Sequence, residues 1–287
     1  MGWLVDKISD WFRSLLIEGI TSNFNGMFNE LNTKVGDIAT QVGKTPQAWN
    51  SGIFNLIRTL SDTVIIPIAG VILTFVLTYE LIHMVMERNN MADFDAFAIF
   101  KWIFKTFVAV YILTNTFNIV MGIFALAGQA VNNSATIIGN TIDINLSMSA
   151  LQSQLNAMST GGLMGLFIES AILSLAMKIV SICIFLIIYA RMVEIYLTVS
   201  IAPIPFATMA NREWGQIGNN YLKGLFALAF QGFLIMVCVA IYAVLLQSIP
   251  TSASVHAAVW GCMGYTVLLC FTLFKTGSLS KSLFGAH

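Results

Sequence analysis

The chain has 287 residues, of which 57% are hydrophobic and only 10% are charged, and its mean hydropathy is +0.80. Soluble domains contain about 45–50% apolar and about 25% charged residues, so this composition excludes an ordinary soluble protein and predicts an integral membrane protein. The formal net charge is zero. This balance argues against nucleic acid as a tightly bound partner, because affinity for DNA comes mainly from clustered Lys and Arg.

The N-terminal part, residues 1–60, is predicted to form an external amphipathic helical region ahead of a transmembrane domain at residues 61–287. Its first apolar residues recur at helical spacing opposite charged ones, which is typical of a helix that lies on a membrane surface or against a partner. A second apolar stripe steps by three and four residues and comprises Phe24, Phe28, Leu31, Val35, Ile38 and Val42. Two interpretations stay open: the stripe mediates assembly between copies, or it packs against the membrane helices of its own chain.

Apolar runs predict five membrane-spanning helices, at about residues 63–86, 103–126, 162–200, 224–248 and 256–274. Pro67 should kink the first of them near one end. The third run is nearly twice as long as a bilayer core requires, but its middle offers no turn residue, so we expect one long helix. The fold class is therefore all-α, a polytopic transmembrane helical bundle.

The distribution of basic residues predicts the orientation. The polar segment 127–160 contains no Lys or Arg and is expected to be an external loop with a short helix around Met148 to Met158. The five-span arrangement places eight basic residues on the opposite side: Arg88, Lys101, Lys105, Arg191, Arg212, Lys223, Lys275 and Lys281. The positive-inside rule makes that side cytoplasmic. We expect a multi-pass protein of the cytoplasmic membrane with its N-terminus outside and its C-terminus in the cytoplasm.

Ionisable residues within spans are costly and are therefore candidates for function. Glu80, Glu169 and Lys178 meet this criterion. Glu80 and Lys178 lie near the predicted cytoplasmic boundary, where anchoring at the interface is the alternative to a functional role. Glu169 lies in the outer half, where a lumenal role and a packing role both stay open. Arg191 and Glu194 are three residues apart on one helix and are expected to form an ion pair.

No segment carries a catalytic or metal-binding motif. The cysteines lie in apolar runs without a second Cys or His at metal-site spacing and are predicted to be buried free thiols: Cys183, Cys238, Cys262 and Cys270. The three histidines belong to no nucleophile or zinc motif. We therefore expect no enzyme activity, no catalytic residue, no cofactor and no metal.

A resemblance to a known family rests on the run from Ala190 to Pro205, ARMVEIYLTVSIAPIP, followed by a loop with Trp214 and the segment from Tyr221 to Gly224, YLKG. Together with the order of the spans, this run resembles the TrbL family, which includes the sixth VirB component of type IV secretion and conjugation systems. Pro203 and Pro205 belong to the run, and a simple helix stop is the alternative interpretation for them.

The resemblance implies a non-enzymatic channel or scaffold subunit that helps to transfer DNA or protein across the cytoplasmic membrane. It implies a homo-oligomer that contacts membrane lipid and other secretion-system subunits, and the transferred DNA or protein only transiently. The alternative function is a secondary transporter or small-solute permease, for which Glu169 would be the residue to test.

Overall fold

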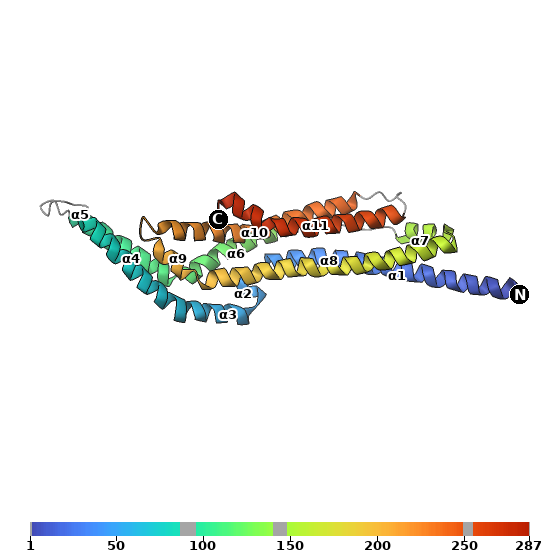
Figure 1. Cartoon of the computed structure of the whole chain (residues 1–287), viewed down its shortest axis with the longest axis horizontal. Coiled ribbons are helices and arrows are strands. Elements are labelled where there is room, and N and C mark those ends of the chain that lie inside the picture. Colours follow the sequence, from blue (N-terminus) through green and yellow to red (C-terminus); the bar gives the residue numbers. More distant parts are fainter. Residues whose placement is uncertain (1, 87–95, 140–147, 249–254, 287) are drawn as a thin grey trace. The chain divides into compact units, whose positions relative to one another are not determined.

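The computed structural model describes residues 2–86, 96–139, 148–248 and 255–286. These residues form helices and turns without any strand, which confirms the all-α class. The elements in chain order are α1 (Gly2–Gly43), α2 (Pro46–Trp49), α3 (Ser51–Leu60), the π-helical turn η1 (Ser61–Ile65), α4 (Ile66–Met86), α5 (Ala96–Thr114), α6 (Thr116–Gly139), α7 (Met148–Ala157), α8 (Thr160–Ser200), α9 (Pro203–Thr208), α10 (Gly215–Gln247) and α11 (Val255–Phe284) (Figure 1).

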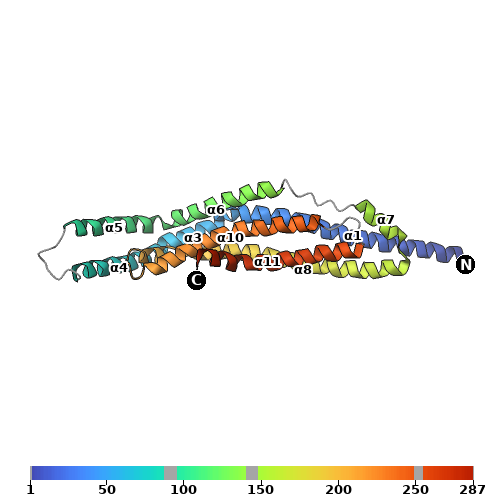
Figure 2. The same ribbon diagram turned by 90° about the horizontal axis from the view of Figure 1, so that it is seen from above.

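Among the described residues, five helices are long and apolar enough to cross a membrane: Ser51–Met86, Phe97–Thr114, Thr160–Ser200, Gly215–Gln247 and His256–Phe284. The second differs from the expected span at 103–126, because the helix breaks at Asn115 between α5 and α6 (Figure 2). Asn115 donates from its side chain to the Tyr111 carbonyl at 2.9 Å. The same carbonyl also accepts the Asn115 backbone N–H at 3.1 Å, so the side chain shares an acceptor with the helix backbone at this point.

Part of the polar segment expected to be a loop is helical, since α6 continues to Gly139. Ala127 and Ala130 favour helix, and Val131 is buried and anchors this part of α6. The short helix expected around Met148 to Met158 is confirmed as α7.

A local distortion precedes Pro67, as expected from its missing backbone N–H. The preceding turn, η1, is π-helical, with the Ile66 N–H bonded to the Ser61 carbonyl. π-Helical turns accommodate an irregular hydrogen-bond pattern within an otherwise continuous helix. The ribbon changes direction between α3 and α4 at this point (Figure 1).

The third span is one long helix, as predicted, and it ends at Ser200 ahead of the two prolines. The prolines also begin the next element: α9 starts at Pro203. Proline is favoured at the first helical position, because its fixed φ suits the helix and its missing N–H would have no partner there.

The chain divides into two compact units. Unit 1 consists of residues 1–42, 132–188 and 235–275, and unit 2 of residues 43–131, 189–234 and 276–287. Each unit joins segments that are distant in sequence, so neither coincides with the division predicted at residue 60. That division concerns the membrane boundary and stays a prediction.

In unit 1, α1 lies against α7 and α8. Asn23 of α1 donates to the Ser170 hydroxyl of α8 at 3.0 Å, and Arg13 donates to the Asn156 carbonyl of α7 at 2.7 Å. Three residues of the predicted stripe are buried within the chain: Phe24, Ile38 and Val42. The side chains of Phe28, Leu31 and Val35 lie outside the described part. The burial of the three agrees with packing inside the chain, while the assembly role stays a prediction.

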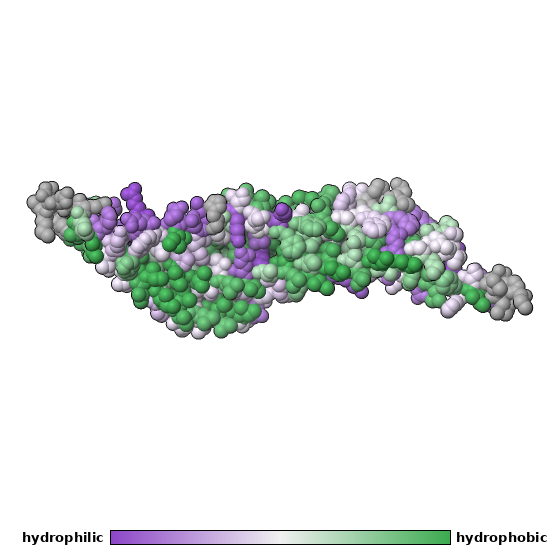
Figure 3. Space-filling model, viewed as in Figure 1, coloured by the Kyte–Doolittle hydropathy of each residue, from purple (hydrophilic) through white to green (hydrophobic). Residues whose placement is uncertain are grey.

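In unit 2, α9 packs against α4 and α5 around Ala69, Leu73 and Ala207. A larger core beside it gathers aromatic side chains from four helices, including Phe54, Phe117, Tyr196 and Phe206. The other side of α3 and α4 is exposed and apolar. It forms a continuous hydrophobic area in Figure 3, to which Leu56, Val64, Val71 and Phe75 contribute. Such an area is typical of a surface that faces lipid.

Candidate functional site

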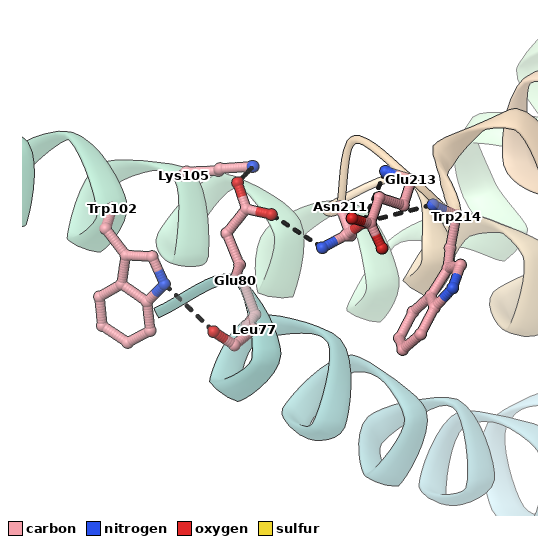
Figure 4. A network of polar contacts seen from close by, with 7 residues as sticks. All are labelled: Leu77, Glu80, Trp102, Lys105, Asn211, Glu213 and Trp214. Carbon is pink, nitrogen blue, oxygen red and sulfur yellow. Dashed lines mark hydrogen bonds and ion pairs between the residues drawn. The ribbon is translucent and has the colours of Figure 1, made fainter. Parts of the chain in front are cut away.

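Glu80 is the centre of a polar network in unit 2. Its Oε1 accepts a hydrogen bond from Lys105 Nζ on α5 at 2.7 Å, and its Oε2 accepts one from Asn211 Nδ2 at 2.8 Å (Figure 4). The Asn211 Oδ1 in turn accepts the backbone N–H groups of Glu213 and Trp214 at 2.7 and 3.3 Å. Glu80 therefore ties α4 to α5 and to the turn between α9 and α10.

Glu80 lies in the C-terminal part of α4, and its partner Lys105 lies near the middle of α5. Glu80 lies about 9 Å before the end of α4, and Lys105 about 14 Å after the start of α5. Their side chains are 27% and 39% exposed, so solvent still screens the pair. An ion pair of this exposure contributes about 1 kcal/mol or less. Its main effect is to neutralise a carboxylate near the end of an apolar helix.

Aromatic side chains surround the network. Trp102 donates its indole N–H to the Leu77 carbonyl at 3.3 Å, as Figure 4 shows. Trp214 stacks on Phe75 and on Tyr79, with ring centroids 5.4 and 5.2 Å apart. Trp and Tyr are enriched where a membrane meets water, because their rings are apolar and their N–H or O–H groups are polar.

The network lines one side of an open pocket of about 470 Å³. Other side chains of the lining are polar or basic and come from the same three segments, namely Tyr79, His83, Lys101, Arg212 and Glu213. Lys101 and Arg212 are exposed. This end of α4 and α5 thus combines several positive charges with a cavity large enough for a small polar group.

Arg191 does not pair with Glu194 as the i,i+3 spacing suggested. Among the described residues the two form no ion pair within 4 Å, and Glu194 instead accepts from Lys281 Nζ of α11 at 3.3 Å. Arg191 is buried, and its Nε has no hydrogen-bond partner in the described part of the chain. Gly232 of α10 makes room for it, since a Cβ there would lie 2.7 Å from Arg191 Nη2. The i,i+3 spacing allows an ion pair between Arg191 and Glu194, but the packing of the helices buries the Arg191 guanidinium.

Glu169 is the centre of a separate polar group in unit 1. Its Oε2 lies 2.5 Å from His256 Nδ1, and its Oε1 accepts from the Trp260 indole N–H. Both partners are on α11. The sequence left a lumenal and a packing role open for Glu169 and did not identify His256 or Trp260 as its partners. These contacts with His256 and Trp260 favour the packing role over an unpartnered carboxylate in a lumen, although the role itself stays a prediction.

The remaining sequence candidates lie apart from these networks. Lys178 is exposed on α8. Pro203 is buried and Pro205 half-buried in α9, where they contribute to the packing beside α4. The four cysteines are free thiols; Cys262 and Cys270 are buried as predicted, whereas Cys183 and Cys238 are only half-buried. No group of three or more His, Cys, Asp or Glu able to hold a metal occurs among the residues that the structure describes.

The sequence interpretation missed Asn211 and the two tryptophans beside it. A signal for the tryptophans was present, because Trp102 and Trp214 lie close in sequence to Lys101, Lys105 and Arg212, as expected for an interfacial belt. Asn211 gave no such signal, since polar residues in a turn usually face solvent.

The sequence matches the family described as TrbL/VirB6 plasmid conjugal transfer like protein over residues 31–203, more than half of the chain. The matched region includes Glu80, Lys105, Glu169 and Arg191, and it ends ahead of Asn211. No curated protein and no solved structure matches the chain. The chain is thus a multi-pass membrane protein that belongs to the TrbL/VirB6 family of conjugal transfer components.

Proposed function

We propose that this chain is a membrane channel or scaffold subunit of a conjugative type IV secretion system, where it helps to transfer DNA or protein across the cytoplasmic membrane. The observation that carries the proposal is the family match over residues 31–203, which contains three of the five candidate spans. The family is a structural component of secretion systems, so the proposed role is not enzymatic.

The charges and the surface of the chain support this role. Many large apolar side chains on the candidate spans are exposed, as expected for helices covered by lipid or by other subunits. Glu80, Glu169 and Glu194 each have a cationic or ionisable partner on another helix. Sparse, neutralised charge along a path would let a polyanionic strand pass, because dense basic residues would hold it too tightly.

The chain would act as several copies together with other secretion-system subunits. The orientation proposed for it has the N-terminus outside and the C-terminus in the cytoplasm. The pocket lined by Lys101, Lys105 and Arg212 supports this assignment, because it places three of the eight basic residues counted as cytoplasmic at one site.

The experiment that tests the role is an in-frame deletion of the gene from its mobile element. Transfer frequency should fall below detection, while host growth and maintenance of the element stay normal, and the wild-type gene supplied in trans should restore transfer. Normal transfer by the deletion strain would exclude the role and would favour the small-solute permease. If the deletion abolishes transfer, cross-linking of the transferred substrate to the chain would distinguish a channel from a scaffold.

A further inference from the structure

Among the residues that the structure describes, the lining of the pocket beside Glu80 has more positive than negative side chains. Its cations are Lys101, Lys105 and Arg212, and its carboxylates are Glu80 and Glu213. Lys105 is engaged by Glu80 at 2.7 Å. Lys101 and Arg212 are exposed, and neither forms an ion pair with another described residue. Two cationic groups of the lining are therefore not engaged by any acidic residue that the structure describes.

Glu213 also lines the pocket, so the described cations of the lining outnumber its described carboxylates by one, three to two. Its Oε2 accepts a hydrogen bond from the Tyr79 hydroxyl at 3.2 Å. Tyr79 also stacks on Trp214. The Glu213 carboxylate is therefore held beside these two aromatic rings. The bonds of Glu80 to Lys105 and to Asn211 hold another part of the lining. The site is thus built from side chains that hold one another, which reduces the entropy lost when a ligand binds.

The size and place of the pocket indicate the class of ligand. A volume of about 470 Å³ accommodates one small polar group. Trp102 and Tyr79 in its lining are residues that occur at the headgroup level of a membrane. Arg binds phosphate oxygens through two parallel N–H donors, and Lys adds a point charge.

The surface beside the pocket is apolar and belongs to the same helix as Lys101. Phe97, Phe100 and Phe104 of α5 are all mostly exposed. Their spacing of three and four residues places them along one stripe of the helix, next to Lys101. An acyl chain could cover this stripe while its headgroup occupied the pocket. Inorganic phosphate and a nucleic acid backbone have no part that would gain from this contact.

We infer that this pocket binds the phosphate headgroup of an anionic membrane phospholipid, held by Lys101 and Arg212 while the acyl chains lie along the phenylalanine stripe of α5. Bound in this way, the lipid connects α5 to the turn between α9 and α10 independently of Glu80. The inference does not depend on the proposed transfer function, because it concerns only the chemistry of the pocket and its surface.

The test uses the full-length chain purified in an uncharged detergent. Native mass spectrometry would compare phosphatidylglycerol with phosphatidylcholine of the same acyl chains, and the wild type should bind the anionic lipid preferentially. The double variant K101Q/R212Q should bind it about 25-fold more weakly, since each basic residue near an anionic surface contributes about fivefold. K223Q is the control, because Lys223 is exposed on α10 and does not line the pocket, and it should bind like the wild type.

Further binding measurements distinguish a lipid headgroup from other sources of phosphate. Inorganic phosphate and a short single-stranded oligonucleotide should neither bind in the pocket nor displace the lipid at matched concentration. Displacement by either of them, equal binding of the two lipids, or equal losses in K101Q/R212Q and K223Q would each overturn the inference. The variant K101R/R212K retains both charges and should bind more than K101Q/R212Q does. This comparison keeps the test informative if the neutral double variant folds poorly.

Discussion

Replacing Gly218 by valine should lower the free energy of unfolding of the protein by about 1–3 kcal/mol, through overpacking between α9 and α10. A Cβ at Gly218 would lie 2.1 Å from Met209 Cγ and 2.6 Å from the Pro205 carbonyl oxygen. The methionine side chain can move, but the carbonyl belongs to the backbone of α9. Relief of the clash therefore requires α9 to shift.

A shift of α9 would reach the candidate site. The α9 residues Ile204 and Ala207 pack on the α4 core beside Ala69. Asn211 follows α9 after one turn and bonds to Glu80 at 2.8 Å. We expect Gly218→Val to weaken this bond as well as the packing.

The matched control is Gly224→Ala on the same helix. A Cβ at Gly224 would meet nothing within 4 Å, and alanine favours helix over glycine by up to about 1 kcal/mol. The melting temperature of the purified protein in detergent, followed by circular dichroism, should fall for Gly218→Val and stay equal or rise for Gly224→Ala. Equal melting of Gly218→Val and wild type would show that α9 does not pack as described.

Phe24→Ala should destabilise unit 1 by about 3–5 kcal/mol, the usual cost of removing a buried phenylalanine. Phe24 is 0% exposed in the single chain, and the neighbouring Asn23 bonds to Ser170 of α8. The truncation would leave a cavity between helices that cannot fully collapse. The control is Phe12→Ala on the same helix, because Phe12 is 40% exposed, and its loss should cost well under half as much.

This pair of variants also separates the two interpretations of the stripe from Phe24 to Val42. If the stripe packs inside the chain, Phe24→Ala lowers the melting temperature at every protein concentration. If the stripe joins copies, the variant instead reduces the mass of the complex measured by light scattering and leaves the melting of the dissociated chain unchanged. The burial of Phe24 leads us to expect the first result.

Local sequence signals were sufficient where one strong physical effect dominates. The third span is a single helix because its middle contains no residue that favours a turn. Its end at Ser200 follows from two prolines that cannot donate backbone hydrogen bonds. The selection of Glu169 as a candidate follows from the cost of a charge at membrane depth. These inferences concern one segment at a time.

Features that depend on packing between distant segments could not be predicted from the sequence. The second candidate span, Phe97–Thr114, begins earlier than the predicted one, because hydropathy continues through Asn115 whereas the helix is interrupted there. Arg191 was assigned to Glu194 because they are close along one helix, whereas Lys281 provides the partner of Glu194. Asn211 reaches a residue 131 positions away, and no periodicity reveals such a contact.

We propose that this chain crosses the membrane five times with its basic side in the cytoplasm, and cysteine labelling in intact cells tests this topology most directly. The chain would carry single cysteines at Gln152 or Arg212, both exposed, in a background without the four native ones. A membrane-impermeant maleimide should label position 152 in intact cells and position 212 only after the membrane is opened. Labelling of both positions in intact cells, or of 212 alone, would contradict the account.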